Sequence, residues 1–140
     1  MSRNHAALFC GCLISTFVIS AVEAQQPSKA IVGTWRGAST CVDKVKFPAC
    51  NDEEVIYQIT VIDKSDSVTV HADKIVNGKR ESMGDNRFGP GARGTWVSRF
   101  PLGRDTGVIT LTVHGDDMDG TFIQQIQGQV RKMSLRRQPG

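Results

Sequence analysis

The chain contains the stretch Val55-Ile56-Tyr57-Gln58-Ile59-Thr60-Val61, which decides how the rest of the sequence is interpreted. Val55, Tyr57, Ile59 and Val61 stand at every second position, so they share one face of an extended strand. β-branched and aromatic side chains are also the types that strands favour. We therefore predict a strand with one apolar face over residues 55–61.

Apolar residues also recur at every second position in the sequence before and after this stretch. Asn77-Gly78 is a strong local signal, because both residues tolerate the positive φ of a two-residue hairpin turn. Residues 84–94, with Gly89-Pro90-Gly91 inside them, are expected to be a flexible loop. The strands predicted in this way are residues 31–37, 55–61, 68–73, 79–83, 95–100, 108–114, 119–127 and 130–136.

Eight strands joined mostly by short turns, with no amphipathic helix of three turns, predict an all-β domain. The short connections favour an eight-stranded antiparallel up-and-down barrel, which removes sheet edges and holds side chains or one small ligand inside. A β-sandwich is the alternative architecture.

Length and composition limit the function classes. The 140 residues allow one domain with a short appendage, and the 39% hydrophobic fraction is enough for a packed core. The 17 Lys and Arg against 14 Asp and Glu give a net charge of only +3. Because a dedicated nucleic-acid binder usually shows a clustered basic face, we expect no nucleic-acid partner.

Residues 1–24 have the features of a cleaved signal peptide. Arg3 supplies the positive start, residues 6–22 are almost all apolar or small, and Val22-Glu23-Ala24 resembles a cleavage site. A membrane anchor and a lipoprotein with Cys10 or Cys12 in its attachment site are the alternatives. If residues 1–24 are a cleaved signal peptide, we expect a secreted or periplasmic protein with a flexible tail at residues 25–30 and no stable membrane anchor.

Cys41 and Cys50 are the two cysteines that remain after such cleavage. In an oxidising compartment a pair of this kind most simply forms a disulfide. A metal or redox pair is the alternative, but eight residues separate the two cysteines and no histidine is close in sequence. We therefore predict a disulfide between Cys41 and Cys50.

Gly33-Thr34-Trp35 near the start of the first predicted strand, together with Arg131 in the last one, resembles the calycin (lipocalin-like) pattern. In that superfamily a Gly-x-Trp opens the barrel and a basic residue of the final strand lies across the indole. The resemblance implies a barrel over residues 31–137, a C-terminal tail at 138–140, and a contact between Trp35 and Arg131. The chain also resembles a small secreted bacterial domain of unassigned function.

No set of residues predicts catalysis, a metal or a cofactor. His71 and His114 alternate with apolar neighbours, so both are expected to face outward. Asp116, Asp117 and Asp119 cluster in a turn, but no calcium-binding loop with a closing Glu follows them. An enzyme remains a minor alternative.

The leading hypothesis is a non-enzymatic barrel that binds a small apolar or amphipathic molecule. The alternative is an inhibitor or interaction module that acts on a secreted enzyme such as a peptidase, with the 25–30 tail inserted into that enzyme and Phe47-Pro48 adding contacts. The residues expected to line the ligand site are Trp35, Tyr57, Trp96, Phe100, Phe122 and Arg131.

Overall fold

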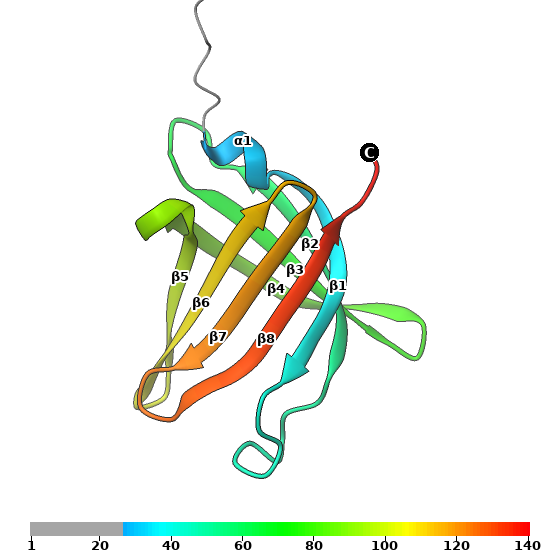
Figure 1. The fold of residues 1–140 in the computed structure, drawn as a ribbon, viewed down its shortest axis with the longest axis vertical. Helices are drawn as coiled ribbons and strands as arrows, with labels where there is room; N and C mark the ends of the chain where they lie inside the picture. The colour runs from blue at the N-terminus through cyan, green and yellow to red at the C-terminus, as the bar shows by residue number, and fades with distance from the viewer. Residues whose placement is uncertain (1–26) are drawn as a thin grey trace, which may run out of the picture.

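The computed structural model describes residues 27–140, which form a closed β-barrel with one short helix at its end (Figure 1). Each strand pairs antiparallel with the next one in sequence, and the last strand pairs with the first. The predicted eight-stranded up-and-down barrel is therefore confirmed, and its architecture is lipocalin-like. The elements are α1 (Pro27–Ile31), β1 (Gly33–Cys41), β2 (Glu53–Val61), β3 (Val68–Val76), β4 (Lys79–Pro90), a 3-10 turn (Ala92–Gly94), β5 (Trp96–Leu102), β6 (Asp105–His114), β7 (Asp117–Gln124) and β8 (Gly128–Arg137).

The fourth strand is longer than predicted, because residues expected to be a flexible loop from 84 to 94 continue β4 as far as Pro90. Backbone pairing with β3 runs from Val76 opposite Lys79 to Val68 opposite Phe88. A bulge between Ala72 and Asp73 breaks the alternation. Most side chains of β4 face solvent, so the strand carries almost no apolar signal.

The beginning of the domain also differs from the prediction. Residues Pro27–Ile31 form a helical turn rather than a loose tail, and the first strand covers 33–41 rather than 31–37. Ile31 is fully buried against the barrel core, and the Trp35 indole donates a 2.8 Å hydrogen bond from Nε1 to its carbonyl oxygen. These contacts fix α1 across one end of the barrel, which we call the closed end (Figure 1).

The basic residue that lies across the Trp35 indole is Arg137, and the predicted contact with Arg131 is wrong. The Arg137 guanidinium carbon lies 4.2 Å from the ring centroid, and Trp35 and Arg137 are opposite each other in the β1–β8 ladder. Arg131 is opposite Cys41, at the other end of that ladder. Both arginines point inward because they share one parity, but the pairing register places them at opposite ends of the barrel.

The packed core fills the closed end and the middle of the barrel. Its inward side chains are buried, and they come from all the strands. Pairing around the wall is uneven, because β4 and β5 pair only through Gly89 with Val97 and Pro90 with Trp96, whereas the other neighbouring strands pair over seven or more positions. The core consists of Ile31, Trp35, Val55, Tyr57, Ile59, Val68, Val70, Ala72, Phe88, Trp96, Leu111, Met118, Met133 and Leu135.

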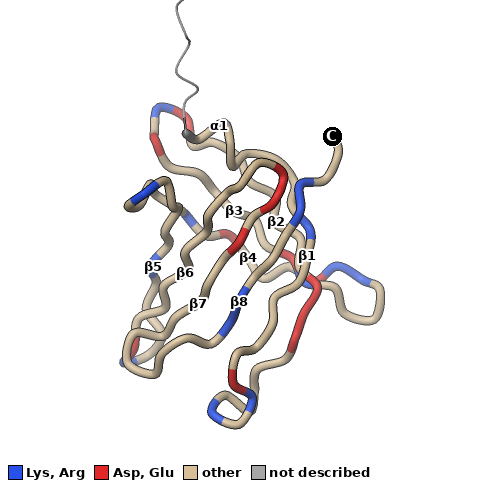
Figure 2. The backbone as a smooth tube through the Cα atoms, viewed as in Figure 1, with Lys and Arg blue, Asp and Glu red and all other residues tan. Residues whose placement is uncertain are grey.

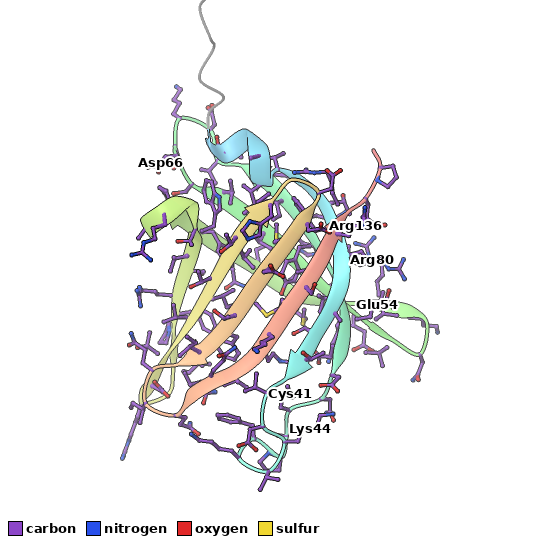
Figure 3. All side chains as sticks on the ribbon, viewed as in Figure 1. Cys41, Lys44, Glu54, Asp66, Arg80 and Arg136 are labelled. Atoms are coloured by element: carbon purple, nitrogen blue, oxygen red, sulfur yellow. A yellow bond between two sulfur atoms is a disulfide. The ribbon has the colours of Figure 1, made fainter. Side chains whose placement is uncertain are left out.

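The predicted disulfide between Cys41 and Cys50 is confirmed. It closes the connection between β1 and β2 at the end of the barrel opposite α1, as the position of Cys41 in Figure 3 shows. We call residues 42–52 the disulfide loop and this end of the barrel the open end.

Replacing Cys41 and Cys50 together by serine is expected to lower the free energy of unfolding by about 2–3 kcal/mol, because the unfolded chain regains the entropy of a short loop. Urea unfolding monitored by circular dichroism measures this loss. Wild-type protein treated with a reductant should unfold like the double variant. An unchanged urea midpoint in both samples would show that the cross-link does not stabilise the barrel.

Candidate functional site

A cleft of about 430 Å³ lies at the open end, between the disulfide loop and the end of the β7–β8 hairpin. This volume is in the range of small-molecule sites. Its lining combines apolar groups, two amides and two cations. The lining residues are Lys46, Phe47, Pro48, Ala49, Cys50, Gln124, Gln127, Val130 and Arg131.

Hydrogen bonds hold the disulfide loop in place over this cleft. The Asp43 carboxylate accepts the backbone N–H groups of Val45 and Lys46 at 3.0 and 2.9 Å, which makes a tight turn. The Lys46 ammonium group donates to the carbonyl oxygen of Gln127, which ties the loop to the turn between β7 and β8. The two walls of the cleft are therefore joined directly.

Asp52 anchors the other side of the loop. It accepts a 2.7 Å hydrogen bond from the Lys44 ammonium group and a 2.8 Å bond from the Cys41 backbone N–H. The bond from Lys44, supported by the bond from Cys41, holds the pKa of Asp52 below its usual value. Asp52 is therefore ionised at neutral pH and keeps both contacts.

Arg131 lies where the barrel interior meets the cleft. Its Nη1 donates to the Ser39 carbonyl at 3.1 Å and to the Ser39 hydroxyl at 2.9 Å. Its Nη2 donates to the Asn51 carbonyl at 2.6 Å and lies 3.1 Å from the Glu53 carboxylate. The charge of Arg131 is thus balanced by Glu53, and the guanidinium is fixed in one orientation.

Tyr57 is a buried aromatic residue whose phenol is influenced by the charges of this ion pair. Burial raises the pKa of its phenol to about 12, while the charges of Arg131 and Glu53 act on it in opposite directions. Tyr57 is therefore a neutral phenol at any physiological pH. Its hydroxyl can exchange hydrogen bonds but cannot act as a base.

The six residues predicted to line a ligand site fall into two groups. Phe100 and Phe122 are only partly buried and stack with ring centroids 5.9 Å apart, and Phe122 is opposite Arg131 in the β7–β8 ladder. Tyr57 lies within electrostatic range of Arg131. Trp35, in contrast, packs under Arg137 at the closed end, and Trp96 is buried opposite Leu111 in the core.

Gln124 is a residue of the cleft that the sequence did not reveal. Its side-chain oxygen is buried and has no hydrogen-bond partner within residues 27–140. A buried acceptor without a donor costs free energy, so such a group invites a donor from a ligand or from water. No pattern in the sequence marks Gln124, whereas the short cysteine spacing with Phe47-Pro48 did mark the opposite wall.

The histidines lie away from the cleft, on the outer surface. His71 contacts Asp85 at 2.5 Å through Nδ1 and Asp73 at 3.3 Å through Nε2, and the hydrogen bond with Asp85 raises its pKa. Asp73 is also paired with Arg80 at 2.6 Å. This outward-facing cluster was not expected from the sequence, because β4 brings Asp85 and Arg80 beside β3. His114 is exposed on the strand end as predicted, 4.0 Å from Asp119.

Two further observations concern only residues 27–140. No group of three or more His, Cys, Asp and Glu side chains in this part of the chain is arranged to hold a metal ion. None of the helices described there has the length and apolar character needed to cross a bilayer.

Comparisons with known proteins do not assign the chain to a family. No protein-family model and no curated protein sequence matches it. Among solved structures, the chain is similar to the S-type phycobiliprotein lyase CPES of Guillardia theta, with 15% identity over 81% of this chain and 91% of that one and a TM-score of 0.45. It is also similar to secretory abundant heat soluble protein 4 of Ramazzottius varieornatus, with 13% identity over 81% of this chain and 96% of that one and a TM-score of 0.49.

Proposed function

We propose that the protein is a non-enzymatic barrel that binds a small amphipathic molecule at its open end. The single observation that carries this proposal is the cleft of about 430 Å³, whose lining combines apolar and polar groups, with a buried acceptor that lacks a donor. Small-molecule sites usually combine apolar surface with a few polar groups that fix the orientation of the ligand, and an amphipathic ligand suits a lining of both kinds.

The apolar part of the ligand would lie against the disulfide-loop wall. Phe47 and Pro48 from the loop and Val130 from β8 supply carbon surface on opposite sides of the cleft. The stacked pair of Phe100 and Phe122 lies next to the cleft without lining it, because Phe122 is the cross-strand neighbour of the lining residue Arg131. These rings are the part of the predicted ligand-lining set that we retain in the proposal.

The polar part of the ligand is expected to carry a hydrogen-bond donor rather than a full negative charge. Glu53 already balances Arg131, and both Nη atoms of Arg131 already have acceptors. The Gln124 oxygen, in contrast, is an acceptor without a partner in the described chain. A hydroxyl or N–H group would satisfy this buried oxygen once a small movement of the lining side chains lets the donor reach it.

The alternative function, an inhibitor that inserts its N-terminal tail into an enzyme, has less support. Ala30 and Val32 are held through their carbonyl oxygens by Arg137, and Ile31 is buried in the core. Inserting this segment elsewhere would require the closed end to open. Residues 25 and 26 lie outside the described residues.

We also propose that the protein works in an oxidising compartment outside the cytosol. The disulfide between Cys41 and Cys50 supports this, since such bonds rarely persist in reducing compartments. The signal peptide predicted at residues 1–24, with its cleavage site, lies outside the residues that the structure describes.

The ligand proposal is tested with two matched probes, 1-naphthol and 1-methoxynaphthalene, which share an apolar body but differ in the hydroxyl donor. In an NMR titration we expect both probes to shift the amide resonances of the disulfide loop. The dissociation constant for 1-naphthol should be about tenfold lower, because only this probe gives Gln124 a donor.

Two variants and one control make the test specific. Phe47→Ala should weaken the binding of both probes. Gln124→Leu should remove the difference between their dissociation constants. Gln58→Leu, at an exposed position on the outer face of β2, should change neither affinity. Shifts confined to surfaces away from the cleft, or no saturable shift with either probe, would overturn the proposal.

A further inference from the structure

The two most exposed large apolar side chains of the described chain are Val45, 94% exposed, and Ile126, 75% exposed. Val45 is in the disulfide loop, and Ile126 is in the turn between β7 and β8. These two segments are the same ones that form the walls of the cleft. Exposed aliphatic side chains at single positions are ordinary on a protein surface. Their coincidence at the rim of one cleft requires an explanation.

Both apolar tips are held in fixed positions. The Asp43 carboxylate accepts the backbone N–H of Val45, so the turn directs this side chain away from the barrel. The backbone N–H of Ile126 donates to the Asp105 carboxylate at 3.0 Å. The bond from Lys46 to the Gln127 carbonyl joins the two segments. We call Val45 and Ile126 the rim pair.

Positive charges flank the more exposed member of the rim pair. Lys44 and Lys46 stand on either side of Val45 in the sequence, and both are exposed. Figure 2 shows basic residues at the far tip of the disulfide loop, at the end of the barrel opposite α1. Figure 3 shows Lys44 at this end and Asp66 at the other. The pair of Lys44 with Asp52 is exposed on both sides, so the lysine remains open to an external anion while it contacts the carboxylate.

A bilayer with anionic headgroups fits this arrangement better than a protein does. Two aliphatic tips on protruding loops offer far less area than the roughly 1,000 Å² that a specific protein interface needs. A membrane interface, in contrast, accepts separate apolar tips and attracts the lysines beside them through its surface potential. The partner that fits this surface is therefore a fluid lipid bilayer with anionic headgroups and an apolar interior.

We propose that the rim pair, with Lys44 and Lys46, docks the open end of the barrel on an anionic phospholipid membrane. The mouth of the cleft then faces the lipid surface. If the proposed small-molecule function is also correct, an amphipathic ligand can pass between the membrane and the cleft without crossing bulk water. The docking itself does not depend on a ligand.

The experiment is cosedimentation of the full chain with vesicles of phosphatidylcholine and phosphatidylglycerol in equal parts, compared with vesicles of phosphatidylcholine alone. We expect binding to the mixed vesicles, with weaker binding at high salt. The double variant Val45→Ser with Ile126→Ser should bind about tenfold more weakly. Lys46→Gln should bind about fivefold more weakly.

Matched controls lie at the closed end. Val61 is 56% exposed at the end of β2, and Lys64 is exposed in the turn that follows. Val61→Ser and Lys64→Gln remove the same kinds of group and should leave lipid binding unchanged. Because every variant carries the same residues 1–26, differences among them report only the substituted positions.

Three results would overturn the proposal. The first is no preference of the wild-type chain for anionic vesicles. The second is an equal effect of the rim-pair and closed-end substitutions. The third is a dimer in solution, detected by light scattering, that the Val45→Ser and Ile126→Ser variant converts to a monomer. That result would assign the rim pair to a second copy of the chain.

Discussion

Replacing Gly37 by alanine is expected to lower the free energy of unfolding by about 4 kcal/mol or more, one of the largest effects of any single methyl group in this barrel. A Cβ atom at Gly37 would lie 2.0 Å from the Ser134 carbonyl oxygen and 2.7 Å from the Leu135 Cα atom. Both are backbone atoms of β8, so no side-chain rotation can relieve the overlap. The β1–β8 ladder, which closes the barrel, must separate at this point.

Gly89→Ala is the matched control for this prediction. Gly89 also lies within a strand and has no positive φ, but its Cβ would meet nothing closer than the Ser67 hydroxyl at 3.9 Å. We expect Gly89→Ala to change stability by less than about 1 kcal/mol. Urea unfolding monitored by tryptophan fluorescence compares the two variants. Similar urea midpoints for both would show that the seam between β1 and β8 is looser than these distances imply.

The elements with one apolar face could be predicted from the sequence. On the predicted apolar face of β2, Val55, Tyr57 and Ile59 are buried as expected, but Val61 at the end of the strand is 56% exposed, and Ile56 on the other face is also buried. β4 could not be predicted in full, because backbone pairing with β3 holds it and its side chains mostly face solvent. The bulge beside Ala72 and the positive φ of Gly84 further disrupt its period.

Parity and register differ in how far the sequence determines them. Alternation correctly predicts that Arg131 shares a face with Met133 and Leu135, but it does not determine which residue of β1 lies opposite. The stagger between strands of a closed barrel sets that pairing. Arg137 comes six positions after Arg131, about 20 Å along a strand. The general pattern of an arginine over Trp35 was therefore predictable, and the particular arginine was not.

Only one wall of the cleft, the disulfide loop, could be predicted, because the position of the other wall depends on how the barrel closes. The disulfide and Phe47-Pro48 are local features of the sequence, so the loop could be suspected. The other wall comes from Gln124 and Gln127, which approach the loop only because the barrel closes between β8 and β1. A contact such as Lys46 with Gln127, 81 residues apart, follows from that closure and not from any local pattern.

The second large expected effect concerns the closed end. It distinguishes the role of Arg137 from that of its neighbour Arg136. Arg137→Gln is expected to lower the free energy of unfolding by about 3–4 kcal/mol, because it removes a cation from the Trp35 ring and charged hydrogen bonds to two backbone carbonyls. Because the guanidinium is partly exposed, solvent screens these interactions, and the expected loss is smaller than their simple sum. Circular dichroism in urea measures the change independently of the Trp35 fluorescence.

The adjacent Arg136 supplies the control, because it is exposed on the outer face of β8, as Figure 3 shows. Arg136→Gln removes the same charge and should shift stability by less than about 0.5 kcal/mol. Arg137→Lys should recover only part of the loss, since an ammonium group keeps the charge but cannot reach the Ala30 and Val32 carbonyls with one planar fork. Equal losses for Arg136→Gln and Arg137→Gln would mean that net charge, and not the contact with Trp35 and α1, stabilises the closed end.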